Sequence, residues 1–193
     1  MERAYGHVRS ALEPAIFNHS VRVWLLADHL ARREGLHGLE SEALAVACLF
    51  HDAGTAQRYD GPQRFEVEGA DAARMFLAEH GAAWPEPLLQ DVWQAIALHT
   101  SPGIAERMGG LTRLVRLGVL ADFGRSDLIE SAGEQLLASL DELPRLSIET
   151  VLGDAVVEQA MRSPGKAPSA SWPGVLLSAH LADPHHGGVN PAF

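Results

Sequence analysis

Apolar residues recur at steps of three and four along most of the chain, which is the spacing of one face of an α-helix. The first long stretch opens at Glu13-Pro14, with proline where a first-turn residue loses no hydrogen bond, and stops at Gly35. A second stretch begins at Ser41 and runs through His51. Further helices are predicted over residues 63–80 (closed by Gly81), 85–99, 111–121, 134–140, 148–161 and 172–181.

Several of these apolar faces also carry a polar residue, which a simple helical core does not need. His19 and His51 fall on the inward faces of the first two helices, and Asp122 finishes the apolar face of the 111–121 helix. Asp52 follows His51 and, in a continuing helix, would point about 100° further round the axis. Because burying an unpaired charge is costly, an inward-facing carboxylate such as Asp122 needs a partner.

No strand-like alternation and no internal repeat interrupts this pattern, so the predicted fold class is all-α, a helical bundle. At 193 residues the chain is long enough for one domain with a sizeable core, and residues 1–193 are interpreted as a single domain. The Pro/Ser/Gly-rich stretch 163–173 is expected to be a surface loop. From Pro184 onward no periodicity remains, and His185-His186 are expected in a flexible tail.

The charge balance limits the classes of partner. Lys+Arg 15 against Asp+Glu 25 gives a net charge of −10, which argues against non-specific nucleic-acid binding, since that needs a basic face. A small-molecule substrate, even an anionic one met by one or two arginines, remains compatible with this charge. The sequence leaves open whether the chain forms a homo-oligomer.

Cysteine usage and the apolar runs indicate a cytoplasmic protein. Cys48 is the only cysteine, so there is neither a disulfide framework nor a thiolate zinc site. The residues that follow Met1 contain no signal-peptide apolar region, and the apolar run 43–50 is far too short to cross a bilayer. No membrane partner is therefore expected.

Four residues form a candidate metal site: His19, His51, Asp52 and Asp122. For each residue alone, a satisfied core polar group or a helix cap is the simpler explanation. Jointly, four such residues in one small core would need several unrelated partners. One divalent ion satisfies all four, and mixed nitrogen and oxygen donors suit zinc first, with iron, manganese or nickel as alternatives.

In their order and spacing, these residues resemble the signature of the HD-domain superfamily of metal-dependent hydrolases, which is His, then His-Asp, then Asp in an all-helical core. The resemblance covers about residues 13–125, the predicted metal-binding core, and weakens after about Arg125. The C-terminal helices beyond that point are expected to cover the core. The resemblance is carried by Asn18-His19-Ser20-Val21-Arg22, Leu49-Phe50-His51-Asp52-Ala53-Gly54 and Gly118-Val119-Leu120-Ala121-Asp122.

Within the superfamily, residues 64–74 and 95–105 are similar to the cyanamide hydratase-like branch, which implies addition of water to a small nitrile-type nitrogen compound. The nucleotide-cleaving branch carries a Glu a few residues after the His-Asp pair. Here residues 53–57, which follow that pair, contain no acidic residue. Two-metal branches place a further histidine where this chain has Phe65-Glu66. His80 lies on the order of 20 Å further along the same helix, so it is interpreted as a helix cap.

The predicted catalytic residues are Asp52 and Glu66 as candidate proton acceptors and His99, a third inward-facing histidine, as the group that orients or protonates the substrate nitrogen. Glu66 also has an ordinary explanation as a helix N-terminal acid. Trp24, Trp93 and Phe65 are candidate walls of a small pocket, although aromatic residues at helical spacing usually belong to the core.

Three other functions remain open at this point. A phosphomonoester or nucleotide hydrolase would use Arg22, Arg58 or Arg64 to clamp phosphate. A two-iron oxygenase would use His80 or His99 in an extra metal site. A catalytically silent helical module would keep the metal for stability alone.

Overall fold

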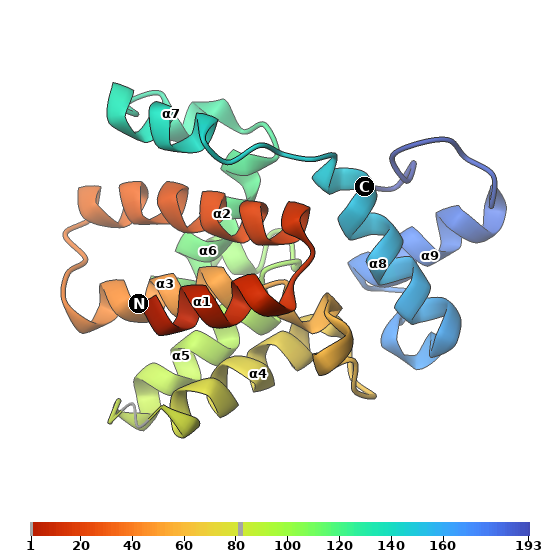
Figure 1. Ribbon diagram of the computed structural model, residues 1–193, viewed down its shortest axis with the longest axis horizontal. Helices are drawn as coiled ribbons and strands as arrows, with labels where there is room; N and C mark the ends of the chain where they lie inside the picture. Colours follow the sequence, from red (N-terminus) through yellow and green to blue (C-terminus); the bar gives the residue numbers. More distant parts are fainter. Residues whose placement is uncertain (1, 81–82) are drawn as a thin grey trace.

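The computed structural model describes residues 2–80 and 83–193, and all regular secondary structure in these residues is helical, as predicted (Figure 1). None of the described helices is long and apolar enough to cross a membrane. The α-helices are α1 (Glu2–Ala11), α2 (Pro14–Arg33), α3 (Leu39–Phe50), α4 (Phe65–Glu79), α5 (Glu86–Ala97), α6 (Gly110–Asp122), α7 (Glu134–Asp141), α8 (Ile148–Arg162) and α9 (Trp172–Ala182).

The core lies between α2, α3, α5 and α6, and α4 packs against α5. Every residue of α3 from Ala43 to Phe50 is buried, because this helix is surrounded by its neighbours. Helices α2 and α6 pack closely at Gly118. A Cβ atom at Gly118 would lie 2.8 Å from the backbone oxygen of Val23 on α2, a distance that a side chain does not tolerate.

Helix α1 was not predicted from the sequence. Its buried residues are Ala4 and Val8, and with Gly6 between them this short stretch carries too little apolar periodicity to stand out. In the structure α1 packs on α3, so the helix forms because tertiary contacts bury its small apolar face.

The end of α4 agrees with the prediction for His80. This residue follows the last helical position, and its Nδ1 lies 2.8 Å from the backbone oxygen of Phe76, so the ring caps the helix. The predicted cap Gly81 lies outside the described residues.

Two predictions for the C-terminal part hold only in part. The stretch 163–173 is not simply a surface loop, because Lys166 is 3% exposed and its ammonium group contacts Asp60 and the Gly61 oxygen. The tail beyond residue 184 folds back instead of extending freely: Asn190 is buried and donates a hydrogen bond to the Leu176 oxygen at 3.1 Å. Neither contact follows a sequence period, which is why pattern analysis missed both.

Candidate metal centre

Three histidine rings have their protonation fixed by the oxygen atoms that they contact. His51 Nδ1 lies 2.7 Å from the backbone oxygen of Cys48, and His99 Nδ1 lies 2.6 Å from the backbone oxygen of Ile96. His19 Nδ1 lies 2.7 Å from a carboxylate oxygen of Asp122. Since these oxygens can only accept, each Nδ1 carries the proton. Each Nε2 therefore presents a lone pair in the neutral ring.

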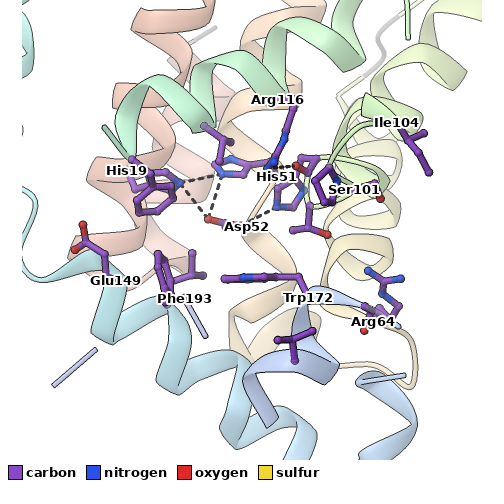
Figure 2. A pocket seen from close by; sticks show the side chains of 18 of the residues that line it. His19, His51, Asp52, Arg64, Ser101, Ile104, Arg116, Glu149, Trp172 and Phe193 are labelled. Carbon is purple, nitrogen blue, oxygen red and sulfur yellow. Dashed lines mark hydrogen bonds and ion pairs between the residues drawn. The ribbon is translucent and has the colours of Figure 1, made fainter. Parts of the chain in front are cut away.

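All three Nε2 atoms surround the carboxylate of Asp52, which is 1% exposed (Figure 2). The distances are 3.1 Å from His51, 3.3 Å from His99 and 3.6 Å from His19. The Nε2 atoms of His19 and His51 are themselves 3.3 Å apart. Among the described residues, neither carboxylate oxygen of Asp52 accepts a hydrogen bond.

The backbone explains how His51 and Asp52 both reach this point. Helix α3 ends at Phe50, His51 is its C-cap, and Asp52 adopts φ −103° and ψ 7°. The chain therefore leaves the helix at Asp52, and the side chains of both residues reach the same cluster, with 3.1 Å between His51 Nε2 and the Asp52 carboxylate. The short helix Ala53–Thr55 follows directly.

The donor set fits a divalent metal ion. A buried carboxylate beside three lone-pair nitrogens is unfavourable unless a positive charge joins them. Donor atoms of His19, His51 and Asp52 all lie within 4.8 Å of one another, and this is the one such group found among the described residues. Imidazole nitrogen and carboxylate oxygen are ligands that zinc, iron, manganese and nickel accept, so the identity of the metal stays open.

The pKa directions show that Asp52 favours a positive charge beside it, either a second proton on a neighbouring histidine or a bound metal ion. Burial would raise the pKa of Asp52, but the charges and hydrogen-bonding capacity of His51 and His99 outweigh it and hold the pKa well below its usual value. Burial lowers the pKa of His19, which keeps this ring neutral. Burial also acts to lower the pKa of His51, yet the charge of Asp52 prevails and the net direction is upward. Asp52 thus attracts a positive charge to the cluster.

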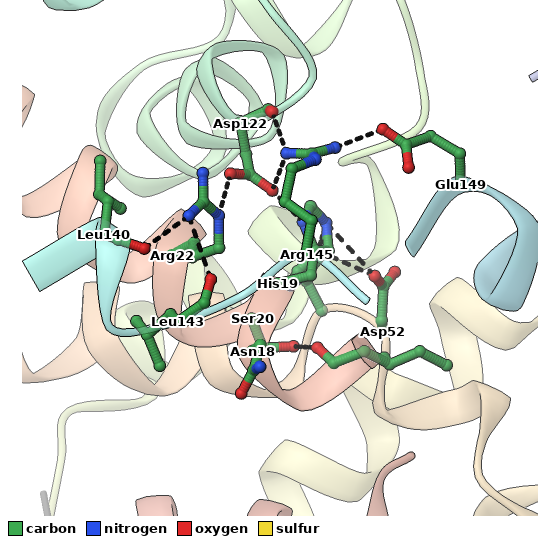
Figure 3. Close-up of polar contacts among 12 residues, drawn as sticks. Asn18, His19, Ser20, Arg22, Asp52, Asp122, Leu140, Leu143, Arg145 and Glu149 are labelled. Atoms are coloured by element: carbon green, nitrogen blue, oxygen red, sulfur yellow. Dashed lines mark hydrogen bonds and ion pairs between the residues drawn. The ribbon is translucent and has the colours of Figure 1, made fainter. Parts of the chain in front are cut away.

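Asp122 lies one contact further out than the other three predicted ligands (Figure 3). One carboxylate oxygen of Asp122 accepts a hydrogen bond from His19 Nδ1, and the other accepts a hydrogen bond from Arg22 Nε at 2.6 Å. Arg145 donates to the Asp122 backbone oxygen at 2.6 Å and lies 3.3 Å from its carboxylate. Burial would raise the pKa of Asp122, but His19 and Arg22 lower it. Direct ligation by Asp122 stays a prediction.

Glu66 lies in the first turn of α4 and is fully buried. Its carboxylate accepts hydrogen bonds from Arg64 Nη2 at 2.5 Å and from Thr100 Oγ at 2.6 Å. Both partners line the cavity next to the histidine cluster. The catalytic role of Glu66 is still a prediction, and its contacts suit it to holding Arg64 and Thr100 in place.

The histidine cluster opens into a cavity of about 710 Å³. Neither Trp24 nor Trp93 lines it, and Phe65 lies just behind its wall, packed against Trp172 and His99. The lining residues are His19, His51, Asp52, Arg64, His99, Thr100, Ser101, Pro102, Ile104, Arg116, Val119, Phe123, Glu149, Leu152, Ala170, Ser171, Trp172, Val175 and Phe193.

Sequence reasoning missed the part of this wall that the C-terminal segment supplies. Trp172 begins α9 and Phe193 belongs to the folded-back tail, while Glu149 comes from α8. The Trp172-Pro173 pair did predict the start of a helix, but no sequence signal placed that helix beside His51.

Each charged residue on the cavity wall other than Asp52 has a partner of opposite charge. Arg64 pairs with Glu66, Arg116 Nε lies 2.9 Å from Glu106, and Glu149 accepts from Arg145 at 2.5 Å. Of the other arginines considered as phosphate clamps, Arg22 contacts Asp122 and Arg58 lies over the Tyr59 ring. The wall is thus close to neutral apart from the metal centre.

An all-helical fold that brings His19 from α2 and the adjacent His51 and Asp52 from the end of α3 to one buried point defines the class as helical proteins with a candidate metal centre. Residues 16–146 match the HD domain family, and this match covers more than half of the chain. The protein therefore belongs to the HD-domain family, whose members are in general metal-dependent hydrolases. A search of curated protein sequences found no match.

Proposed function

We propose that this protein is a metal-dependent hydrolase or hydratase that adds water to a neutral carbon–nitrogen compound, with a cyanamide-like nitrile as the reference substrate and a urea-type product. The observation that carries the proposal is the Asp52 carboxylate, which is buried without a hydrogen bond among three Nε2 lone pairs at the inner end of a cavity. His19, His51 and Asp52 would hold the metal, with Asp122 as the further predicted ligand.

A divalent ion bound there would lower the pKa of water in contact with it and polarise the electrophilic carbon of the substrate. The protein groups then direct the protons. Water adds across the carbon–nitrogen bond: its oxygen joins the carbon and both hydrogen atoms end on nitrogen. Asp52 accepts a proton from the water and passes it to the Nε2 lone pair of His99, 3.3 Å away, and His99 delivers it to the substrate nitrogen. The second water proton follows the same route. Glu66 acts through Arg64 and Thr100 as a positioning residue.

The charge pairing on the cavity wall favours a neutral substrate over a phosphate ester. Phosphate clamps rely on arginine donors that are free to form paired hydrogen bonds with the ligand. Arg64 and Arg116 both face the cavity, but each is already engaged by a carboxylate. Their presence still makes a phosphomonoester hydrolase the second candidate, because a metal ion could complete a phosphate site beside them.

The remaining alternatives have less support. A two-iron oxygenase needs a second cluster of ligands, whereas the described residues gather one group of donor atoms and place His80 as a cap at the far end of α4. A catalytically silent module would leave the cavity beside the metal centre without a purpose, yet it remains an outcome of the test.

The test compares metal-reconstituted wild type, Asp52→Ala and, as a matched control outside the site, His80→Gln. Urea formation from cyanamide and phosphate release from p-nitrophenyl phosphate are measured on all three. Urea formation that disappears in Asp52→Ala and persists in His80→Gln is the expected result. Phosphate release with the same pattern, and no urea, would replace the proposal by the second candidate. Metal binding with neither product would leave the silent module.

A further inference from the structure

Seven aromatic rings form a closed circuit around the cavity, in which the centroids of adjacent rings lie 4.7–6.1 Å apart. Six of them line the cavity, and the seventh, Phe65, lies behind its wall. The centroid distances around the circuit are 5.1 Å for His19–His51, 4.9 Å for His51–His99, 5.7 Å for His99–Phe65, 6.1 Å for Phe65–Trp172, 5.5 Å for Trp172–Phe193, 5.1 Å for Phe193–Phe123 and 4.7 Å for Phe123–His19.

The circuit, which we call the aromatic belt, has two unlike halves. The histidine half surrounds Asp52. In the other half, Trp172 and Phe193 contribute large apolar faces from the C-terminal segment, and Figure 2 shows their side chains across the cavity from Asp52. Adjacent rings meet edge to face along the apolar half, the arrangement that aromatic groups prefer. An incoming planar ring could join this arrangement without rearrangement of the wall.

The size of the cavity does not suit a substrate of only three non-hydrogen atoms. A volume of about 710 Å³ falls in the range of roughly 300–1,000 Å³ that holds drug-sized ligands. One water molecule takes about 30 Å³ of liquid volume, so cyanamide alone would fill a small part of this space. The rest is bounded mainly by apolar groups, with charges that are already paired.

We propose that the natural substrate is a neutral aromatic or heteroaromatic carbon–nitrogen compound, whose ring packs against Trp172 and Phe193 while its carbon–nitrogen bond faces Asp52 and His99. This inference rests on the proposed function for the bond that reacts, and adds the group that the protein recognises. Trp172 and Phe193 are then specificity-determining residues, and the C-terminal segment sets substrate choice for a metal centre built by the preceding helices.

Benzonitrile is the probe, and cyclohexanecarbonitrile is its non-aromatic counterpart of similar size. Binding to metal-loaded and metal-free protein is measured by ligand-detected NMR titration, independently of turnover. The variants are Trp172→Leu and Phe193→Leu, which keep an apolar side chain, and Trp84→Leu as a control away from the cavity. Melting temperature and metal content are recorded for each variant to confirm that it folds.

Benzonitrile is expected to bind more tightly than cyclohexanecarbonitrile. An aromatic contact contributes about 0.5–1.5 kcal/mol beyond the buried area, so Trp172→Leu should weaken benzonitrile binding about twofold to tenfold. Phe193→Leu should also weaken benzonitrile binding, and this variant tests the inference if Trp172→Leu does not fold. Trp84→Leu should bind benzonitrile as tightly as the wild type does. Trp172→Leu should bind cyclohexanecarbonitrile without a comparable loss of affinity.

Equal binding of the two nitriles, or benzonitrile binding that ignores both variants, would overturn the inference. If the protein hydrates cyanamide under those conditions, the proposed function stands and only the aromatic preference is lost. If benzonitrile binds in a Trp172-dependent way but no nitrile is hydrated by metal-loaded protein, the recognition site stands and the proposed reaction is wrong. The two failures are thus separate observations.

Discussion

At the scale of single residues, the metal centre depends on where three protons lie. The Nδ1–H groups of His19, His51 and His99 are each engaged by an oxygen atom, which directs three Nε2 lone pairs toward Asp52. Outer hydrogen bonds of this kind fix the tautomer and orientation of metal-binding histidines. Asp122 performs this task for His19, and two arginines hold Asp122 in turn.

Asp122→Asn tests whether Asp122 supports His19 or binds the metal directly. Loss of an outer carboxylate partner typically costs 10–100-fold in metal affinity, so we expect binding that is weaker by about this factor but still present. The measurement is competition with a chelator of known affinity. Wild-type affinity would show that the contact is unimportant, and complete loss of binding would make Asp122 a direct ligand as the sequence predicted.

At the scale of secondary structure elements, the crossing of α2 and α6 brings His19 and Asp122 together. The two helices approach closely at Gly118, where a Cβ atom would lie 2.8 Å from the Val23 oxygen. The sequence predicted the helix over residues 111–121, and Gly118 within it permits this close approach. It also predicted the helices that carry the histidines, since each apolar face is long and regular.

Gly118→Ala should therefore destabilise the protein and also disturb the site. Overpacking a tight contact costs about 1–3 kcal/mol in the free energy of unfolding, and separation of α2 from α6 would lengthen the His19–Asp122 contact. Urea unfolding gives the stability change. The matched control is Gly109→Ala, where a Cβ atom meets nothing within 4 Å, and a loss as large in the control would contradict this explanation.

A second link between elements joins the C-terminal segment to the loop before α4. The buried ammonium group of Lys166 contacts Asp60 and the Gly61 oxygen, and Arg162 also donates to Asp60 at 2.9 Å. Partial burial acts to raise the pKa of Asp60, but Lys166 and Arg162 outweigh it and lower the pKa below its ordinary value of 3.8. The contribution to stability is thus complete above pH 3.8 and is lost as the pH falls through the lowered pKa.

Asp60→Asn should remove this contribution at neutral pH and flatten the loss of stability in acid. Leaving the Lys166 charge without its partner should cost about 1–3 kcal/mol. Lys166→Met, which removes the charge and keeps the apolar stem, should cost less. Unfolding curves at neutral pH and at about one unit below 3.8 provide the comparison. A wild type and an Asp60→Asn variant with parallel acid dependence would contradict the proposed pairing.

At the scale of the whole molecule, the sequence predicted the candidate metal centre better than the cavity beside it. His19, His51 and Asp52 could be found because they interrupt regular apolar faces, and helical spacing places such residues in the core. Trp172 and Phe193 could not be found this way, because the tail returns to the cavity through contacts such as Asn190 with the Leu176 oxygen, which follow no period. Long-range packing of irregular segments leaves little local signal.

The same division has a functional meaning. The part that matches the HD domain, residues 16–146, supplies His19, His51, Asp52 and His99, whereas α9 and the tail close the cavity over them. We propose that residues 16–146 carry the metal chemistry and that α9 and the tail determine the choice of substrate.

The most direct test of the account is the metal content per chain of protein purified without chelator, compared with Asp52→Ala. We expect about one equivalent of a divalent transition metal in the wild type, because the described residues bring together one group of donor atoms. We expect this metal to be lost in the variant. The absence of metal in the wild type under any reconstitution would contradict this assignment, since the three histidines and Asp52 would then form a buried polar cluster without a metal ion.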